Sequence, residues 1–222
     1  MTKIISAFMF LLFSGSTFSQ NGNLPVKEWG NAAESPLIFY ISGDGGFNYF
    51  SSGLCNSINR AGYSVTALNA RNYFWEKKEP ETAAIDIAAY LEKKFLNRKN
   101  QQLVLAGYSF GADVLPFIVN KLPEIIKMKL KCVLLLTPST TTDLEIHWSD
   151  LFGSNNKRSK DVVAEINRMG IIKTAIISGS SENDFPLKSI KLVNYQNEKL
   201  PGGHHYEGDI DKTAKTIIKY IN

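Results

Sequence analysis

The segment Leu103–Asp113 reads LVLAGYSFGAD and decides the fold that the sequence predicts. Its apolar start, Leu103–Ala106, is followed by Gly-x-Ser-x-Gly around Ser109, and then by residues that can begin a helix. This order is typical of a buried strand, a sharp turn with a serine at its tip, and a helix. Glycine has no Cβ, so Gly107 and Gly111 supply the space that such a crowded turn needs. The segment therefore predicts a presented serine, a candidate nucleophile.

Strands and helices alternate on both sides of this turn. Short apolar runs, typical of strands buried on both faces, lie at 37–41, 63–68, 131–136, 174–178 and 190–195. Helical stretches are predicted at 50–61 and at 160–169. Three more begin at Pro80, directly after the turn at Ser109, and near the end of the chain. Such alternation predicts the α/β class, with a mostly parallel sheet covered by helices on both faces, in one domain over residues 20–222.

The first nineteen residues have the pattern of a secretory signal peptide. Lys3 precedes an apolar stretch, Ile4–Phe13, and small residues in Thr17–Ser19 predict cleavage before Gln20. The alternative is an uncleaved membrane anchor, but the apolar stretch is short for a membrane span. We therefore expect the chain to be exported.

Composition excludes several classes of function. The 222 residues carry a formal charge of +4, without a run of Lys and Arg that would indicate nucleic-acid binding. Cys and His residues do not show metal-site spacing, so we expect neither a metal nor a cofactor. The two cysteines, Cys55 and Cys132, are an even count in an exported chain, and their pairing stays open.

The loops after the predicted strands carry a catalytic set. In a parallel sheet the functional loops lie at the carboxyl ends of the strands. Those ends hold a glycine-rich loop at 42–48, Ser109, Asp184 and the pair His204–His205. The order nucleophile, acid, histidine is that of an α/β-hydrolase. A histidine would take the serine proton, and a carboxylate would orient the imidazole and stabilise the imidazolium.

Two of these assignments have close rivals. Asp184 is the favoured acid, and Glu182 is its alternative in the same loop. His205 is the favoured base because of the tyrosine after it and its offset from Pro201, and His204 is the alternative. The oxyanion donors are assigned to the N–H of Phe110 and an N–H within Asp44–Gly46, with Asp44 and Gly45 as candidates.

For three further features, a structural explanation is favoured over a functional one. The loop at 43–46 lacks the Gly-Lys-Ser/Thr of a phosphate-binding loop. His147 lies in an alternating run, 144–148, which predicts a solvent-facing residue on an edge strand. Trp75 lies in an aromatic loop; such rings pack more often than they recognise, and Trp75 is kept as a candidate for substrate binding.

Several segments together resemble the bacterial virulence protein family of VirJ and the carboxyl-terminal domain of AcvB. The most specific is the extended motif that runs from Gly107 to Pro116, GYSFGADVLP. The others are SGDGG at 42–46, RNYFW at 71–75 with Lys78 and Pro80-Glu81, EIH at 145–147, and LPGGHHY at 200–206. Together they cover nearly all of the chain after the predicted signal peptide.

The resemblance implies an α/β-hydrolase fold in the periplasm and a link to virulence. It implies, through AcvB-like members, hydrolysis of lysyl-phosphatidylglycerol, and, through VirJ, a role in a secretion system. This chain is expected to be a lone domain, without the additional amino-terminal domain of AcvB-like proteins, which leaves substrate and partner undetermined. Because a lysyl ester is positively charged, Asp44 or Asp113 is expected to pair with its ammonium groups.

Three functions follow from these expectations. The first is a serine esterase acting through an acyl-enzyme, with an aminoacylated membrane lipid as a candidate substrate. The second, from a different class, is a binding or assembly factor that contacts envelope or secretion-system proteins. The third is a carboxylesterase for small soluble esters. A Ser109→Ala variant separates the first from the second.

Overall fold

The computed structural model describes residues 24–147 and 158–222, so the predicted signal peptide and Trp148 lie outside the described residues. A seven-stranded sheet has the order β1-β3-β2-β4-β5-β8-β9, in which only β1 is antiparallel to its neighbour. Its strands are β1 (Val26–Trp29), β2 (Leu37–Ile41), β3 (Ser64–Leu68), β4 (Leu103–Tyr108), β5 (Leu130–Leu136), β8 (Thr174–Gly179) and β9 (Tyr195–Leu200). Two short strands, β6 (Thr141–Thr142) and β7 (Lys160–Asp161), pair beside it.

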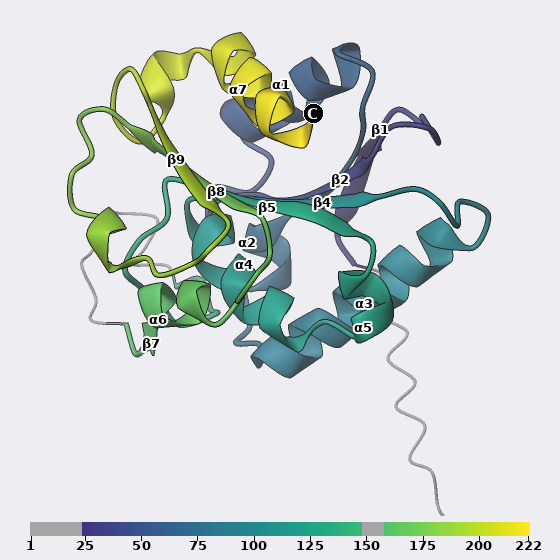
Figure 1. Ribbon diagram of the computed structural model, residues 1–222, viewed down its shortest axis with the longest axis horizontal. Coiled ribbons are helices and arrows are strands. Elements are labelled where there is room, and N and C mark those ends of the chain that lie inside the picture. Colours follow the sequence, from purple (N-terminus) through teal and green to yellow (C-terminus); the bar gives the residue numbers. More distant parts are fainter. Residues whose placement is uncertain (1–23, 148–157) are drawn as a thin grey trace, which may run out of the picture.

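Helices cover both faces of the sheet (Figure 1), which confirms the predicted class. One face carries α1 (Tyr49–Arg60) and α7 (Ile210–Ile221). The other carries α2 (Ala70–Tyr73), α3 (Pro80–Phe95), α4 (Phe110–Lys121), α5 (Glu124–Lys127) and α6 (Val162–Asn167). Single 3₁₀ turns lie at Leu187–Ser189 and Tyr206–Gly208.

The sheet separates two hydrophobic cores. Successive side chains of a strand point to opposite faces. In β2, Phe39 and Ile41 therefore join the core under α3 and α4, while Ile38 and Tyr40 join the core under α1 and α7. Because both faces are covered, β2, β3, β4 and β8 are buried along their whole length. This is the physical reason why their sequences read as continuous apolar runs.

Two strand predictions at the edges of the fold are wrong. The apolar pattern predicts the last strand at 190–195, but β9 is the more polar Tyr195–Leu200. Leu192 is buried and Ile190 half-buried, so this apolar pattern belongs to an irregular segment packed on the core. The alternating run at 144–147 forms no strand either. Leu144 adopts φ 52° there, and both Leu144 and Ile146 are buried.

The cysteines do not pair. Cys55 and Cys132 are both free and buried on the face covered by α1 and α7. Burial raises the pKa of the Cys132 thiol to about 11, so both behave as small apolar side chains. Within residues 24–147 and 158–222, no helix combines the length and apolarity needed to cross a bilayer.

Candidate active site

The turn after β4 holds Ser109 in a strained backbone conformation. Its φ of 52° and ψ of −122° lie where residues other than glycine are rarely found. The turn is fixed from both sides, because the Ser109 N–H donates to Leu136 O of β5 and the Ser109 carbonyl accepts from the N–H groups of Ala112 and Asp113. The serine side chain is thereby presented at the amino-terminal end of α4.

The glycines of the motif have steric reasons. A Cβ on Gly111 would lie 2.2 Å from Ile41 O, and one on Gly107 would lie 2.3 Å from Gly111 O. The first distance shows how closely α4 approaches the end of β2, and the second how sharply the chain turns. Gly43 lies against this turn as well, since its Cβ would be 3.4 Å from the Ser109 Cβ. The strand–turn–helix arrangement that the sequence predicts is therefore confirmed.

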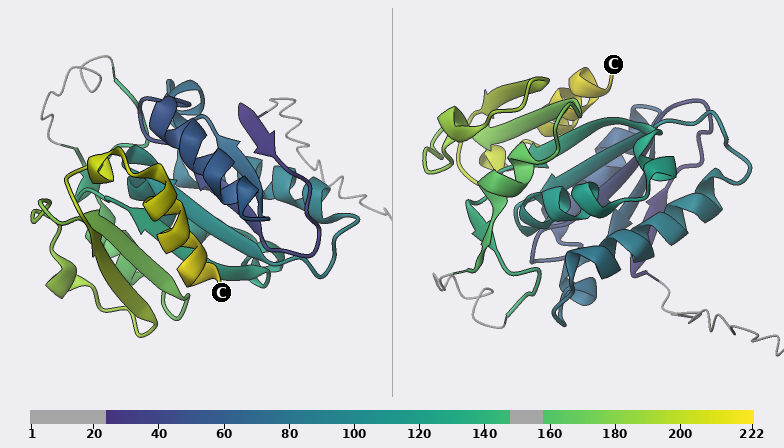
Figure 2. Two further views of the ribbon diagram at one scale, coloured as in Figure 1. Left: turned by 90° about the horizontal axis from the view of Figure 1, so that it is seen from above. Right: turned by 60° about the horizontal axis from the view of Figure 1, so that its bottom comes forward.

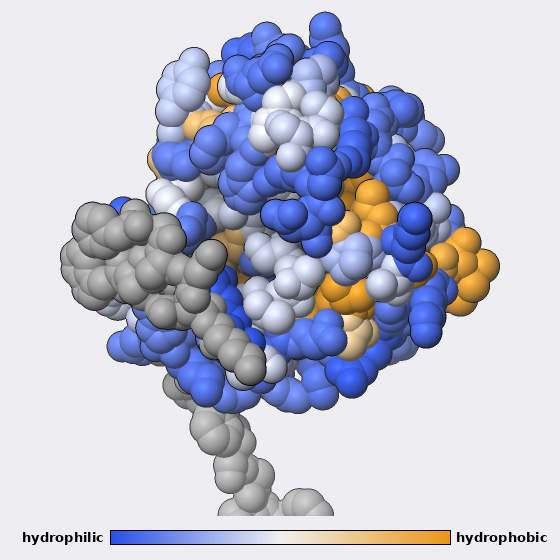
Figure 3. Space-filling view, turned by 90° about the vertical axis from the view of Figure 1, so that its left-hand side faces the viewer, coloured by the Kyte–Doolittle hydropathy of each residue, from blue (hydrophilic) through white to orange (hydrophobic). Residues whose placement is uncertain are grey.

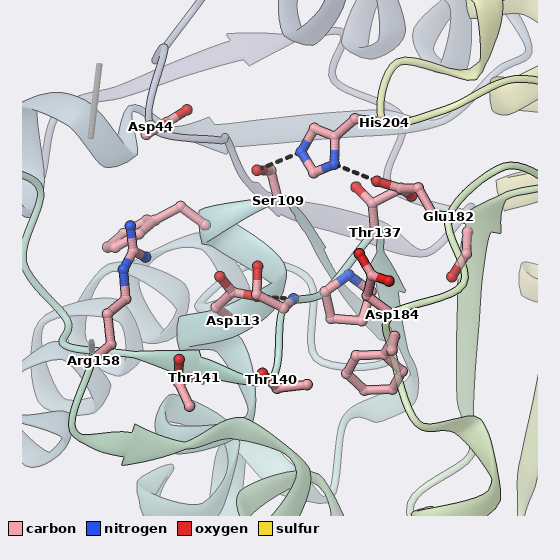
Figure 4. A pocket seen from close by; sticks show the side chains of 15 residues that line it. Asp44, Ser109, Asp113, Thr137, Thr140, Thr141, Arg158, Glu182, Asp184 and His204 are labelled. Atoms are coloured by element: carbon pink, nitrogen blue, oxygen red, sulfur yellow. Dashed lines mark hydrogen bonds and ion pairs between the residues drawn. The ribbon is translucent and has the colours of Figure 1, made fainter. Parts of the chain in front are cut away.

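His204 is the histidine that faces the serine. Its Nε2 lies 2.8 Å from Ser109 Oγ, and its Nδ1 lies 2.7 Å from Glu182 Oε1 (Figure 4). With an Nδ1–H donated to the carboxylate, Nε2 is left as the acceptor for the serine hydroxyl. These three side chains make a continuous chain of hydrogen bonds from Ser109 through His204 to Glu182.

His205, the favoured base in the sequence, does not reach Ser109. Its Nδ1 forms a hydrogen bond with the Tyr108 hydroxyl instead, and its side chain is exposed. The cause is the turn that follows: Tyr206 is buried with φ 51° and donates its hydroxyl to Ile177 O at 2.8 Å. This anchor turns His204 toward the serine and His205 away, so the preference for His205 is corrected.

Glu182 occupies the position for which Asp184 was favoured. The Gly179 N–H donates to Glu182 Oε2 at 3.3 Å, while Oε1 accepts from His204. Asp184 comes from the same loop and lines the pocket, as Figure 4 shows, but its carboxylate has no hydrogen bond with His204. The longer glutamate side chain reaches back to the imidazole from two residues earlier. The preference for Asp184 is therefore corrected as well.

The loops after β8 and β9 meet at a glycine contact. A Cβ on Gly179 would lie 2.3 Å from Gly203 O, so only a glycine lets the two loops approach this closely. Lys199 adds a second tie, because its Nζ donates to Glu182 O at 3.2 Å. Acid and histidine are in this way held side by side although 22 residues separate them.

Two backbone N–H groups at the pocket are candidates for the oxyanion donors. Within the described residues, neither the Phe110 N–H nor the Asp44 N–H donates a hydrogen bond to the protein. Both residues line the pocket in which Ser109 lies, whereas Gly45 is not among the described residues that line it. Phe110 also begins α4, whose positive end favours negative charge. The pair Phe110 and Asp44 fits the role of oxyanion donors.

The pocket itself measures about 440 Å³ and is lined mainly by polar groups. Asp44, Asp113, Glu182 and Asp184 contribute carboxyl groups, and Arg158 contributes a cation (Figure 4). The sequence did not single out Arg158, Phe185 or the residues at 137–141, which also line it. The only signal for the last group was their place after β5, at the same edge of the sheet as Ser109.

Asp113 is a buried member of this lining. Its side chain is 1% exposed, and its Oδ1 accepts the Ser139 N–H at 2.5 Å. Burial raises the pKa of Asp113 to about 7, although the bond from Ser139 and the charge of Arg158 act in the opposite direction. Asp113 therefore supports the loop after β5 and is partly neutral at neutral pH.

The remaining sequence candidates lie elsewhere. Trp75 follows α2, is 38% exposed and is not among the described residues that line the pocket. His147 lies close to Glu145, with 3.6 Å between Nδ1 and Oε1. Among residues 24–147 and 158–222, no group of three His, Cys, Asp or Glu side chains is arranged to hold a metal ion.

Comparison with known families agrees with this geometry. The sequence profile of the family described as bacterial virulence protein (VirJ) matches residues 36–222. The chain belongs to this family. A comparison with curated proteins found no significant match.

Solved structures similar to this VirJ family member are α/β-hydrolases. Est1E from Butyrivibrio proteoclasticus is 13% identical over 88% of this chain and 93% of that one, with a TM-score of 0.60. MGS-MChE2, an alpha/beta hydrolase enzyme from the metagenome of lagoon sediments of Mar Chica, Morocco, is 16% identical over 90% and 95%, with a TM-score of 0.62. A thioesterase domain from the curacin biosynthetic pathway is 14% identical over 87% and 94%, with a TM-score of 0.57. The fold is thus the α/β-hydrolase fold.

Proposed function

We propose that this chain hydrolyses carboxylic esters through an acyl-enzyme on Ser109. The observation that carries the proposal is the chain of hydrogen bonds Ser109–His204–Glu182, at 2.8 and 2.7 Å, on a turn that presents the serine. A strained, presented serine joined to an oriented imidazole is the arrangement that nucleophilic catalysis by serine requires. Esterases and thioesterases among the structural neighbours support the same reaction class.

The reaction proceeds in two halves. His204 Nε2 takes the Ser109 proton while Oγ attacks the ester carbonyl, and the N–H groups of Phe110 and Asp44 stabilise the oxyanion. The imidazolium, held by Glu182, then donates that proton to the departing alcohol, which leaves an acyl-serine. Water, deprotonated by His204, attacks the acyl group, and the acid is released as Ser109 recovers its proton.

The pocket lining supports an acyl group that carries positive charge. Asp44 is half-exposed beside the oxyanion position, whereas Asp113 is buried and already accepts the Ser139 N–H. We therefore prefer Asp44 over Asp113 as the partner of a substrate ammonium. An aminoacyl ester, such as an aminoacylated phospholipid encountered in the periplasm, is the substrate class that this arrangement favours.

Purified protein tests the proposal with two esters of one alcohol, one lysyl and one acetyl. We expect both to be hydrolysed, the lysyl ester with the lower KM, and Ser109→Ala to abolish both reactions. Asp44→Asn should raise KM for the lysyl ester at least tenfold and leave the acetyl ester unchanged. Hydrolysis of neither ester by folded protein would reject the proposal, and an unchanged KM for the lysyl ester would reject the role of Asp44.

A second proposal rests on the family description as a virulence protein. On this proposal the chain acts by contact with envelope or secretion-system proteins, and catalysis is dispensable. Cells that carry Ser109→Ala separate the two proposals. Full restoration of the deletion phenotype by this variant supports the contact role, and failure to restore it, with normal protein level, supports the enzyme.

A further inference from the structure

Exposed aliphatic side chains gather at the edge of the sheet opposite the pocket. In a parallel sheet the loops that enter the strands lie at the amino edge, remote from the carboxyl ends that hold Ser109. Four connecting segments, 96–102, 123–131, 170–173 and 190–194, precede β4, β5, β8 and β9, which are neighbours in the sheet. We call them the amino-edge loops, although the second includes the short helix α5 and the first two residues of β5. The left panel of Figure 2 shows them along one side of the molecule, the side of the C-terminus.

Five of the eight most exposed large hydrophobic residues lie in these four loops. The five are Leu96, Ile125, Met128, Ile171 and Val193, with exposures between 56% and 90%. Figure 3 presents the other side of the molecule, the left-hand side of Figure 1, where hydrophobic residues occupy part of the surface among hydrophilic ones; the amino-edge loop at 96–102 lies on the face turned away from the viewer. Burying such residues gains free energy, so a cluster of them at one edge indicates a contact surface.

The same loops are strongly basic. Together they hold seven Lys or Arg residues and a single acidic residue, Glu124. The seven are Arg98, Lys99, Lys127, Lys129, Lys131, Lys173 and Lys191. None of them forms a salt bridge with a carboxylate among the described residues. The positive charge of the whole chain, +4, is thus concentrated at this edge, while carboxyl groups gather at the pocket.

We propose that this amino-edge surface docks the protein onto an anionic lipid bilayer. Aliphatic side chains that project from loops can enter the headgroup region, and lysines around them attract anionic lipids. A protein partner is the weaker match, because protein interfaces are depleted in lysine and rely on aromatic residues and arginine. A molecule docked in this way directs its Ser109 pocket away from the bilayer it is bound to, so the proposed lipid ester would reach the pocket from a facing membrane or from solution and not from the bound bilayer.

Sedimentation with vesicles tests the docking surface. The protein is mixed with vesicles of phosphatidylcholine alone, or of phosphatidylcholine with phosphatidylserine, at low and at high salt. We expect the bound fraction to rise at least tenfold with the anionic lipid and to fall again at high salt, because screening weakens surface charge interactions. All variants carry the same amino terminus, so any contribution of residues 1–23 cancels between them.

Two double variants locate the surface, and two single variants serve as controls. Ile171→Ser with Val193→Ser, and Lys99→Glu with Lys191→Glu, should each lower binding to anionic vesicles at least tenfold and leave ester hydrolysis unchanged. Tyr49→Ser and Ile85→Ser remove residues that are 86% and 63% exposed away from this edge, and they should bind like the wild type.

Several results would overturn the proposal. Binding that ignores anionic lipid, a control variant that loses as much binding as the double variants, or a wild type that stays in solution would each do so. A wild type that fails to sediment but forms a dimer by light scattering, lost in Ile171→Ser with Val193→Ser, assigns the surface to a second copy of the chain instead. Loss of ester hydrolysis in all proteins would reject only the proposed function.

Discussion

The two halves of the candidate catalytic centre are held in different ways. The turn at 107–111 is fixed by backbone contacts, since Gly107 and Gly111 leave no room for a Cβ and Ser109 is bonded to β5. The loops that carry Glu182 and His204 approach closely at Gly179 and are joined by two backbone hydrogen bonds, from the Ser180 N–H to Leu200 O at 2.7 Å and from the Ser181 N–H to Gly202 O at 3.0 Å. Their two functional side chains are oriented by hydrogen bonds of their own. Their side chains are 30% and 40% exposed. Backbone contacts therefore hold both halves, but the candidate acid and base are oriented by hydrogen bonds between partly exposed side chains.

The adjacent histidines provide the largest test of this contrast. His204→Gln should lower kcat/KM about 10⁴-fold, because the proton acceptor of Ser109 is lost. His205→Gln is the matched control at the next residue. It should lower kcat/KM less than tenfold, because His205 forms a hydrogen bond with Tyr108 and not with the serine. Steady-state hydrolysis of a neutral ester measures both. The opposite ranking would show that the loop rearranges in the working enzyme.

The acid pair gives a somewhat smaller effect. Glu182→Gln should lower kcat about 10³-fold, since the amide neither fixes the histidine tautomer nor stabilises the imidazolium. Asp184→Asn removes a carboxylate from the same loop without touching His204, so kcat should change by less than about threefold. Equal losses in the two variants would mean that the acid role is shared between them.

Glycine variants test how rigidly each half is held. Gly111→Ala places a Cβ 2.2 Å from Ile41 O and should destabilise the protein by about 3–4 kcal/mol, with loss of activity. Gly203→Ala in the histidine loop meets nothing nearer than Ser181 Oγ at 3.6 Å, and should cost about 0.5 kcal/mol or less. Urea unfolding followed by fluorescence measures both. Similar losses of stability would remove the distinction between the two halves.

Asp113 gives the smallest expected change, which depends on pH. Burial raises the pKa of Asp113 in the folded protein to about 7, above the ordinary value of 3.8, so the native state binds the proton more tightly. Stability is therefore lost as pH rises from about 4 to about 7. Asp113→Asn keeps an oxygen that accepts the Ser139 N–H but does not titrate. As the pH rises from 5 to 8, its free energy of unfolding should therefore increase by about 2–3 kcal/mol relative to that of the wild type. If the stability of the wild type and that of Asp113→Asn change equally with pH, a buried Asp113 that is neutral at low pH is contradicted.

Residues whose surroundings follow from the chain itself could be predicted from sequence. The strand that leads into Ser109 is buried on both faces, so its apolar run clearly predicts a strand. The glycines of the turn are required because a Cβ at either position would collide with the backbone. The order of the functional loops follows from a parallel sheet. These constraints are enough to predict the fold and the position of the candidate nucleophile.

The choice between neighbours in an irregular loop could not be predicted. His204 and His205 have the same chemistry, and what separates them is a buried tyrosine, Tyr206, in a left-handed conformation that no sequence period reveals. Glu182 prevailed over Asp184 through its reach. At the sheet edge, β9 is polar and lacks the apolar run that is typical of a buried strand. The apolar residues around Leu192 suggest a strand, but they lie outside the sheet and pack on the core.

Labelling with a fluorophosphonate tests the central claim most directly, because this reagent reacts with a serine only when a base activates it. Intact mass and peptide mapping report how much adduct forms and on which residue. We predict one adduct on Ser109 in the wild type and in His205→Gln, and labelling at least 100-fold slower in His204→Gln. A folded wild type that does not react, an adduct on another residue, or slow labelling in His205→Gln alone would contradict the assignment of Ser109, His204 and Glu182.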